Sequence, residues 1–575
     1  MERINKVALG CGMLITATIL WSWKNFDKPE TFGYTKGYDK PLTMCGSVYY
    51  DWTDTTYVQA KILAGLGDLH YPVTTSSIKA QEFFEQGLRL VYAFNHWEAI
   101  QSFREATRLD PEFAMGYWGL ALAYGPNLND VAPKDRERIA FESIQKAITR
   151  KSHVSPVEND WIDAMATRYN GKAYVNRDSL NQAYSIAMIQ LAKKYPADSE
   201  AQTLCADAIM NTMPWDYWEK DGSPKSATAD AKYLLEAVMK MFPNHPGAHH
   251  LYIHLVEASP KPEQALPSAK FLESAMPGAG HIIHMPAHIY LRTGQYSRSI
   301  ELNLRAAKVD EDYLSNSSNY GMYRFSYYPH NVDFIVFSSY MEGRSSLGIQ
   351  NAMKLAYKGS TITISNSTWA QYLLAEPILA FVRFGKWNEI LSLPNPDGNL
   401  LYSNVMYRFG RGLALLRIGK TTEAKKEMIQ LDSLGALDTL NSFYFSLNPA
   451  SQIVKIPINI LRGELLVKLN KIEEGLAALR EAVKAEEDLR YNEPPDWKIP
   501  ARHFLGAALL EAGRYEEAEA VYLEDLKKNP ENGWSLNGLL QSQSKLGKNS
   551  EMITTAKRFA MAWKNSDIAL SSSRF

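Results

Sequence analysis

Apolar residues recur at spacings of three and four from about residue 78 to residue 570, which is the period of an amphipathic helix. In one clear case, Ala99, Phe103, Ala106 and Pro111 follow one another at spacings of 4, 3 and 5 residues. Small residues allow two helices to approach closely, and a proline ends a helix. Runs of alternating β-branched residues are few. The pattern therefore predicts an all-α fold built from antiparallel helix pairs.

The same frame of small, aromatic and proline positions returns along the chain. It recurs at Gly506, Ala518, Tyr522 and Pro530, at Gly412 and Ala424, and at Gly463, Leu479 and Ala482. This frame is similar to the tetratricopeptide repeat, a helix-turn-helix unit of 34 residues. Stacked units of this kind form an α-solenoid with a concave face, and the length allows roughly eight to ten helix pairs. The stretch "KGSTITISNSTWA" (358–370) interrupts the period and is expected to be a loop or an irregular connection.

Changes in composition suggest four parts of the chain. Residues 1–24 are predicted to be a signal anchor or signal peptide, and residues 25–77, which mix Pro, Gly, Tyr and charge without a helical period, a linker or arm. Residues 78–359 should form a first helical array that contains most of the histidines. Residues 360–575 should form a second array.

The N-terminal segment has the features of an export signal. Arg3 and Lys6 precede an uncharged run that ends in Trp21 and Trp23. Positive charge before such a run places the body of the protein outside the cytoplasm, in the periplasm or cell envelope. The tryptophans and the lack of an A-x-A-like cleavage site favour an uncleaved anchor over a cleaved signal. Lipidation at Cys11 is a weaker alternative, because apolar residues continue beyond it.

Charge and cysteine content limit the partners further. Lys plus Arg number 62 against 63 Asp plus Glu, and no basic run is long enough to neutralise a phosphate backbone. Nucleic acid is therefore not expected as a partner, and membrane contact is expected only through the N-terminal segment. Cys45 and Cys205 could form one disulfide in an oxidising compartment, but two cysteines 160 residues apart are weak evidence for it.

Histidines are concentrated in one region of the chain. Eight of the twelve lie between residues 245 and 330. Within this region, His250 and His254 are repeated as His284 and His288 at an offset of 34 residues, one full repeat. Each pair has the i, i+4 spacing that places two side chains on one helix face. Both pairs should therefore face the same way on stacked helices.

The resemblance to the repeat class implies that these positions line the concave groove, together with His281 and Glu257. Four imidazoles converging there would suit a transition metal, since Zn, Cu, Fe and Ni all accept imidazole nitrogen. His281, His330 and Asp333 are further candidate ligands. Hydrogen bonding to an anionic ligand and simple packing remain as alternatives. His245 and His249 are expected to be packing residues, His96 a cap or surface group, and His70 a candidate extra ligand.

The chain also resembles a more particular family of bacterial tetratricopeptide-repeat proteins over roughly residues 65–340. The resemblance is carried by "YAFNHWEAIQSFREATRLDPEFAMGYWGLALAYGPNLN" (92–129), "NTMPWDYW" (211–218), "HPGAHHLYIHLVEASPKPEQALPSAKFLESAMPGAGHIIHMPAHIYLRTGQY" (245–296) and "YPHN" (328–331). It implies the solenoid fold and marks the histidine block as the family's signature, without implying an activity. After "YPHN" the relatives tend to have x-His-Phe, whereas this chain has Val332, Asp333 and Phe334. Asp333 could still ligate a metal through oxygen.

Two classes of function fit the sequence. In the first, the protein is an extracytoplasmic scaffold that holds a protein, a peptide, a glycan or a small ligand in its groove, with a histidine-lined site for a transition metal such as Cu, Zn or Fe. In the second, it is a metal-dependent oxidoreductase or hydrolase in which Glu257 acts as the base. Phosphate-binding loops, HExxH and GxSxG are absent from the sequence. Repeat arrays are mostly binders, which favours the first class.

Overall fold

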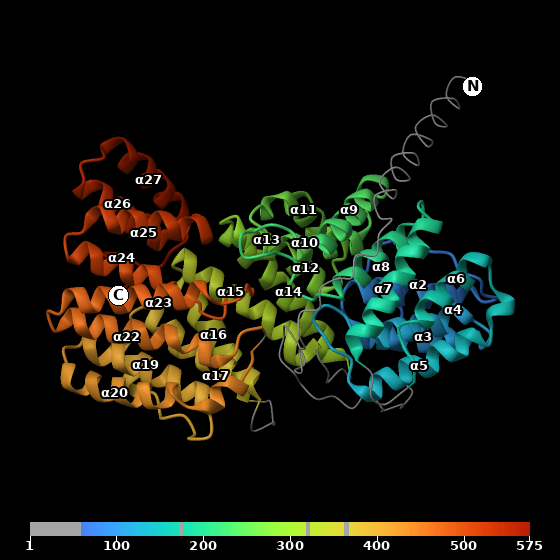
Figure 1. Cartoon of the computed structure of the whole chain (residues 1–575), viewed down its shortest axis with the longest axis horizontal. Helices are drawn as coiled ribbons and strands as arrows, with labels where there is room; N and C mark the ends of the chain where they lie inside the picture. Colours follow the sequence, from blue (N-terminus) through green and yellow to red (C-terminus); the bar gives the residue numbers. More distant parts are fainter. Residues whose placement is uncertain (1–58, 172–175, 318–322, 361–366, 446) are drawn as a thin grey trace. The chain divides into compact units, whose positions relative to one another are not determined.

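The computed structural model describes residues 59–171, 176–317, 323–360, 367–445 and 447–575. These residues form α-helices, short 3-10 helices and one π-helical turn, and no strand occurs among them (Figure 1). The prediction of an all-α solenoid of helix pairs is confirmed. The helices belong to two compact units: unit 1 holds residues 59–260 and Ser274–Gly278, and unit 2 holds Lys261–Glu273 and Ala279–Phe575. The two units thus divide near residue 260. The boundary between two helical arrays at residues 359 and 360 stays a prediction.

Unit 1 begins with turns and bends over residues 59–77 and continues as helices. These are α2 (Ile78–Tyr92), α3 (His96–Leu109), α4 (Ala114–Tyr124), α5 (Lys134–Ile148), η2 (Lys151–His153), α6 (Pro156–Ala166), α7 (Arg177–Lys194), α8 (Ser199–Met210), α9 (Ser226–Met241) and α10 (Pro246–Val256).

Helices from η3 onward belong mainly to unit 2. They are η3 (Pro262–Ala265), α11 (Leu266–Ala275), α12 (Gly280–His284), α13 (Pro286–Arg292), α14 (Tyr296–Asn316), the π-helical turn η4 (Tyr323–Tyr327), α15 (Tyr328–Glu342), α16 (Ser345–Ser360), α17 (Thr368–Arg383), α18 (Trp387–Ser392), α19 (Leu401–Arg417), α20 (Thr421–Gly435), η5 (Asp438–Ser442), α21 (Ala450–Ile453), α22 (Lys455–Lys468), α23 (Ile472–Glu487), α24 (Ala501–Glu511), α25 (Tyr515–Lys528), α26 (Gly533–Lys545) and α27 (Asn549–Ala562). Successive helices pack as pairs, for example α19 with α20 and α22 with α23 (Figure 1).

Small residues set the distance between paired helices, as the sequence frame predicts. A Cβ atom added at Gly87 on α2 would lie 2.6 Å from the Phe103 ring on α3, and one added at Gly119 on α4 would lie 2.4 Å from it. Both distances are far below van der Waals contact, so the ring fits only because both positions are glycine. Tyr522 on α25 occupies the corresponding place in a later repeat. A Cβ atom added at Gly506 would lie 2.5 Å from its ring, and one added at Gly538 would lie 2.1 Å from it.

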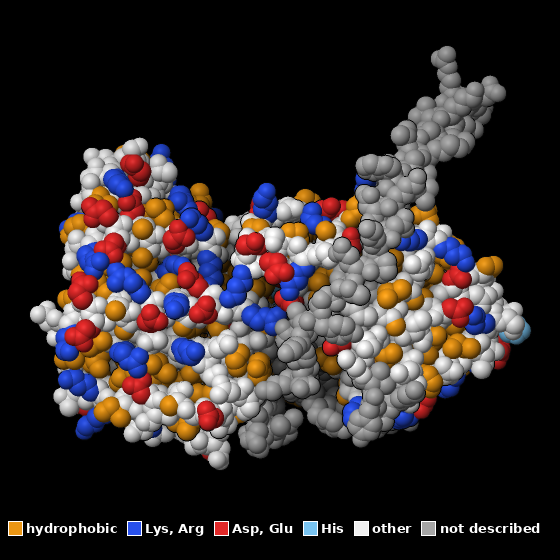
Figure 2. Space-filling model, viewed as in Figure 1, with side chains coloured by type: hydrophobic (Ala, Val, Ile, Leu, Met, Phe, Trp, Pro, Cys, Tyr) orange, Lys and Arg blue, Asp and Glu red, His pale blue; other side chains and the backbone are white. Residues whose placement is uncertain are grey.

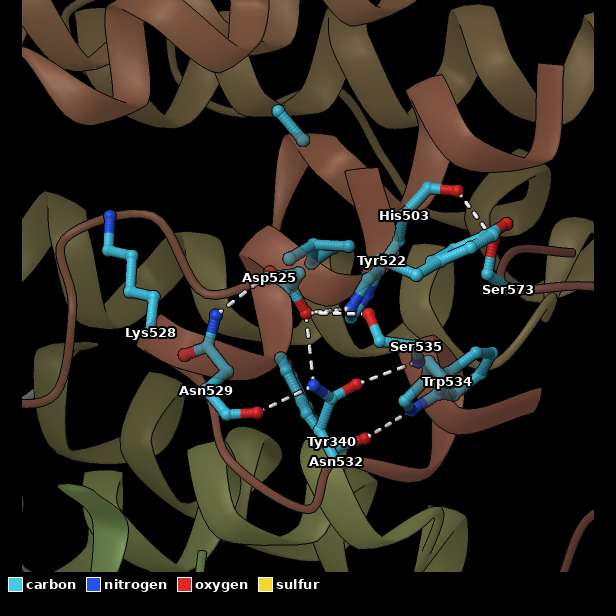
Figure 3. Close-up of polar contacts among 12 residues, drawn as sticks. Tyr340, His503, Tyr522, Asp525, Lys528, Asn529, Asn532, Trp534, Ser535 and Ser573 are labelled. Carbon is cyan, nitrogen blue, oxygen red and sulfur yellow. Dashed lines mark hydrogen bonds and ion pairs between the residues drawn. The ribbon is translucent and has the colours of Figure 1, made fainter. Parts of the chain in front are cut away.

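A buried polar network holds α24, α25 and α26 together (Figure 3). Asp525 on α25 accepts hydrogen bonds from His503 Nε2 at 3.0 Å and from Ser535 Oγ at 2.6 Å. Burial alone would raise the pKa of Asp525, but the charge and hydrogen bond of His503 and the other donors hold that pKa well below its usual range. Next to this network, Trp534 Nε1 donates to the Tyr340 carbonyl on α15 at 2.6 Å. These bonds position α15, which carries part of the candidate site.

The stretch predicted to be irregular is shorter than expected. Lys358 to Ser360 end α16, and α17 begins at Thr368, so the prediction of a loop is wrong for both ends of residues 358–370. Ser367 caps α17 by accepting a hydrogen bond from the Ala370 N–H, a start signal that the sequence pattern alone did not single out. Residues 361–366 lie outside the described residues.

Predictions for the N-terminal segment lie outside the described residues. They concern the anchor or signal over residues 1–24, most of the linker, Cys11 and a disulfide through Cys45. Cys205 is buried in α8. In the part of the chain that is described, no helix combines the length and the apolar character that crossing a membrane requires.

Candidate metal centre

Three histidines of unit 2 come together from three helices. His284 ends α12, His288 lies in the first turn of α13, and His330 is the third residue of α15. One ring nitrogen from each lies within 4.8 Å of the other two. All three side chains are buried, and His330 is the most exposed at 7%. The cluster is therefore enclosed, whereas the sequence predicts an open groove.

The hydrogen bonds of Asn303 define the proton position on His284. Asn303, on α14, donates its Nδ2 to the Ser299 carbonyl at 2.8 Å, which turns its Oδ1 toward His284 Nδ1 at 2.7 Å. An amide oxygen only accepts, so Nδ1 of His284 carries the proton. In the neutral ring, Nε2 of His284 then bears the lone pair.

A carboxylate, that of Glu493, lies beside His288 at ion-pair distance. One carboxylate oxygen of Glu493 lies 3.2 Å from His288 Nδ1, which favours a proton on that nitrogen. The Nε2 atoms of His284 and His288 lie 2.9 Å apart. Two neutral rings with these tautomers would direct two lone pairs at each other, which is repulsive. A metal ion bound by both nitrogens, or one extra proton, removes the repulsion.

An aromatic ring closes one side of the cluster. Phe334, one turn after His330 on α15, has its ring centroid 4.5, 4.7 and 5.0 Å from those of His284, His288 and His330. Phe334 also belongs to a buried apolar cluster with Ala287, Leu291, Tyr296, Phe337 and Met341. Such surroundings exclude water and strengthen a metal–imidazole interaction, since the local dielectric is low.

His281 lies beside this cluster on α12. Its ring centroid is 5.7 Å from that of His284 and 4.7 Å from that of Tyr327. Its backbone N–H points to Tyr323 Oη at 3.3 Å, and that hydroxyl donates to Asp310 at 2.7 Å. His281 is therefore outside the group formed by His284, His288 and His330.

Asp333 is not brought to the histidine cluster. Its carboxylate is paired with the buried ammonium of Lys498 and accepts a hydrogen bond from Tyr372 Oη at 3.2 Å. The expectation of an oxygen ligand at this position is corrected accordingly. The lysine lies 165 residues further along the chain, so local spacing gave no sign of it.

Unit 1 carries the other i, i+4 pair with matching chemistry. His250 Nδ1 donates to the Tyr92 carbonyl at 2.6 Å, and His254 Nδ1 donates to Glu257 Oε1 at 3.0 Å. The two ring centroids are 4.8 Å apart, the same as for His284 and His288. Glu257, predicted as a catalytic base, thus orients a histidine ring. In each pair an amide-type oxygen accepts a hydrogen bond from the first histidine, and a glutamate carboxylate lies beside the second.

The remaining histidines have structural partners. His245 caps α10 by accepting from the Ala248 N–H at 3.0 Å, and its Nε2 contacts Glu200 at 2.9 Å. His96 is buried, contrary to a surface role, and burial together with the Arg136 charge lowers its pKa to about 3. His70 pairs with Glu85 at 2.5 Å and is largely exposed.

Asn303 and Glu493 are the site residues that sequence reasoning missed. Asn303 stands at position 24 of its repeat, where Phe103 and Tyr522 stand in theirs. A polar residue at a position that is otherwise aromatic is a signal that could have found it. Glu493 follows the helical part of a later repeat, and no spacing connects it with His288.

Residues 460–532 match the family model described as the tetratricopeptide repeat. This segment therefore contains the tetratricopeptide repeat. No curated protein matches it. Because the family match covers one part of unit 2, it identifies the repeat and leaves the histidine clusters unassigned.

Several solved structures resemble this chain at low identity. A human IFIT1 dimer with m7Gppp-AAAA is 13% identical, with 85% of this chain and 91% of that chain covered and a TM-score of 0.29. The TPR domain of P58(IPK) is 14% identical, with 82% and 99% covered and a TM-score of 0.21. The Cut9–Hcn1 hetero-tetramer of the APC/C is 12% identical, with 86% and 76% covered and a TM-score of 0.29.

Proposed function

We propose that the protein is a tetratricopeptide-repeat scaffold that holds a transition metal ion at His284, His288 and His330. The observation that carries the proposal is the pair of Nε2 atoms 2.9 Å apart, with both Nδ1 atoms next to oxygen acceptors. Three neutral imidazoles suit Cu, Zn or Fe, each of which would act as a Lewis acid or, for Cu and Fe, as an electron carrier.

The surrounding residues have defined tasks in this proposal. Asn303 accepts a hydrogen bond from His284 Nδ1, and Glu493 places a negative charge beside His288 Nδ1, so both favour a proton on Nδ1, as outer-shell partners commonly do in metal sites. Phe334 keeps water from one side of the three rings. The π-helical turn Tyr323–Tyr327 immediately precedes α15, and turns of this kind are frequent at functional sites.

The scaffold part of the proposal concerns a partner. Repeat arrays bind proteins and peptides along a concave face, and we propose a protein, a peptide or a small ligand here. Figure 2 shows acidic and basic side chains interspersed over the visible face, which suits such partners better than a nucleic acid backbone. We also propose an extracytoplasmic location with tethering through residues 1–24, supported by Arg3 and Lys6 before the uncharged run.

A metal-dependent enzyme is the second candidate. Its proposed base, Glu257, uses one carboxylate oxygen to hold His254 and is fully buried. A base in that position would first have to release its histidine. The binding function is therefore preferred.

Metal binding at the three histidines should weaken as pH falls. A bound metal needs neutral imidazole, and an unperturbed imidazole takes up its proton near pH 6.5. Since protons compete with the ion, affinity should be full above about pH 7 and fall steeply below about pH 6. Calorimetric titration with Zn²⁺ alone, in buffers of different ionisation enthalpy, should show more protons released per ion as pH falls. Affinity that does not change between pH 7.5 and 5.5 would exclude histidine ligation.

A further inference from the structure

The turns between paired helices share one backbone conformation. At eight turns, a residue with positive φ is followed by a residue whose N–H bonds to the carbonyl five positions earlier. In seven of these turns the residue with positive φ is glycine or asparagine: Gly294, Gly343, Gly385, Gly419, Asn470, Gly513 and Gly547. The eighth, between α2 and α3, has Phe94 at φ 54°. An aromatic residue is sterically disfavoured in this left-handed region, whereas glycine is not.

The Phe94 side chain contacts both histidines of unit 1. Phe94 is 5% exposed, and its ring centroid lies 4.4 Å from that of His250. It also lies 5.8 Å from the centroid of His254, with the two planes within 4° of parallel. The strained turn therefore places a ring against both members of the pair, a contact that glycine could not make. Strained residues of this kind concentrate at ligand sites.

Trp215 repeats the arrangement from another segment. It has φ 61°, one of four positive values at non-glycine residues in the described part of the chain. Its indole lies 5.0 Å from the His254 ring at 82°, and its Nε1 donates to the Leu128 carbonyl at 2.8 Å. Two of those four residues thus contact His254, one with its ring parallel to the imidazole and one with its ring nearly perpendicular to it.

The polar contacts complete the arrangement. Tyr92 and Glu257 each accept a hydrogen bond from an Nδ1–H, so Nε2 is the nitrogen that can bind a metal on both His250 and His254. Both side chains are at most 1% exposed. Aromatic walls and oxygen acceptors therefore fix the orientation of both rings before any ion binds.

We propose that Phe94 and Trp215 form an aromatic clamp that positions His250 and His254 as a second metal-binding pair, supplied by unit 1 alone. The proposal extends metal binding to unit 1 and can fail while the three-histidine site of unit 2 stands. It also gives a purpose to the segments around "AFNHW" and "MPWDYW", which neither the fold nor the three-histidine site explains.

The test uses the full chain with His284→Ala, His288→Ala and His330→Ala, and Cu²⁺ alone as the probe. This variant should still bind one Cu²⁺, with pulsed electron paramagnetic resonance showing imidazole nitrogen, and adding His250→Ala and His254→Ala should abolish that signal. Adding Phe94→Leu should weaken Cu²⁺ binding about tenfold and change the spectrum, because an oriented ring loses its support. Phe94→Trp should restore both the Cu²⁺ affinity and the spectrum, because an aromatic ring again contacts the two histidines.

Phe84→Leu is the matched control. Phe84 is a fully buried phenylalanine on α2 whose ring contacts Phe103, Phe113 and Trp118. The substitution Phe84→Leu should lower the stability of the fold as Phe94→Leu does, without changing the affinity for Cu²⁺. Equal Cu²⁺ affinities in the two leucine variants would overturn the clamp. Loss of all Cu²⁺ from the triple variant, while the unmodified chain binds it, would overturn the pair and leave the unit 2 site intact.

A second measurement covers the case in which the triple variant does not fold. The unmodified chain should bind two Cu²⁺ ions, and His250→Ala with His254→Ala should reduce the number to one. An unchanged number would refute the proposal. Absence of Cu²⁺ binding by the unmodified chain would refute the proposed function as well.

Discussion

Replacing Lys498 with methionine is expected to destabilise unit 2 by about 3–5 kcal/mol. The Lys498 side chain is fully buried. Its ammonium is paired with Asp333 and lies 2.5 Å from Glu376 Oε1. Burial disfavours the charged ammonium, but the two carboxylates outweigh burial and raise the pKa of Lys498. Without the lysine, two carboxylates would remain buried with no cation between them.

Chemical denaturation at neutral pH measures this effect. Lys308 pairs with Asp312 on the exposed side of α14, so Lys308→Met is the matched control and should leave the transition unchanged. Adding Asp333→Asn and Glu376→Gln to Lys498→Met should recover much of the lost stability, because no charge is then left buried. A midpoint for Lys498→Met equal to that of the control would show that the ion pair contributes nothing.

Replacing His284, His288 and His330 with alanine should remove the metal from unit 2. Loss of a single outer-shell partner costs a metal site about 10- to 100-fold in affinity, and removing the ligands themselves must cost more. Of the other candidate ligands, His250 and His254 belong to unit 1, and His281 is outside the group of His284, His288 and His330. Titration of this variant with Zn²⁺ should therefore show that the affinity of the site for Zn²⁺ is at least 100-fold lower.

Folding must be separated from binding in this test. The three side chains are buried, so alanine also leaves cavities, and circular dichroism should confirm that the helices persist. Asn303→Leu provides a milder change that keeps all three ligands, and it should lower affinity about 10-fold. His153→Ala removes an exposed histidine and should have no effect. Full Zn²⁺ affinity in the triple variant would place the metal elsewhere or exclude it.

The sequence predicted the fold because the repeat frame is local. Gly87, Phe103 and their equivalents Gly506 and Tyr522 lie within one repeat, where close helix packing demands small and aromatic residues at fixed spacing. The two matching histidine pairs can be recognised in the sequence for the same reason, since an offset of 34 residues preserves the direction in which a side chain points.

Contacts between distant segments could not be predicted in this way. Glu493 and Lys498 reach His288 and Asp333 from more than 160 residues away, and no periodicity connects them. The burial of the histidine cluster could not be predicted either. The repeat frame gives the direction of the His284 side chain, but it does not show that Phe334 covers that side chain. The proposed role of Phe94 could not be predicted either, because a phenylalanine in a helical repeat is usually a core residue and the sequence does not give its positive φ angle.

X-ray absorption at the zinc edge tests the metal centre most directly. The sample is the full chain with His250→Ala and His254→Ala, loaded with Zn²⁺ alone, so that unit 2 supplies the ligands. The account predicts one bound ion whose shell contains three imidazole nitrogens at about 2.0–2.1 Å. A shell made only of oxygen, or a chain that retains no zinc after desalting, would contradict it.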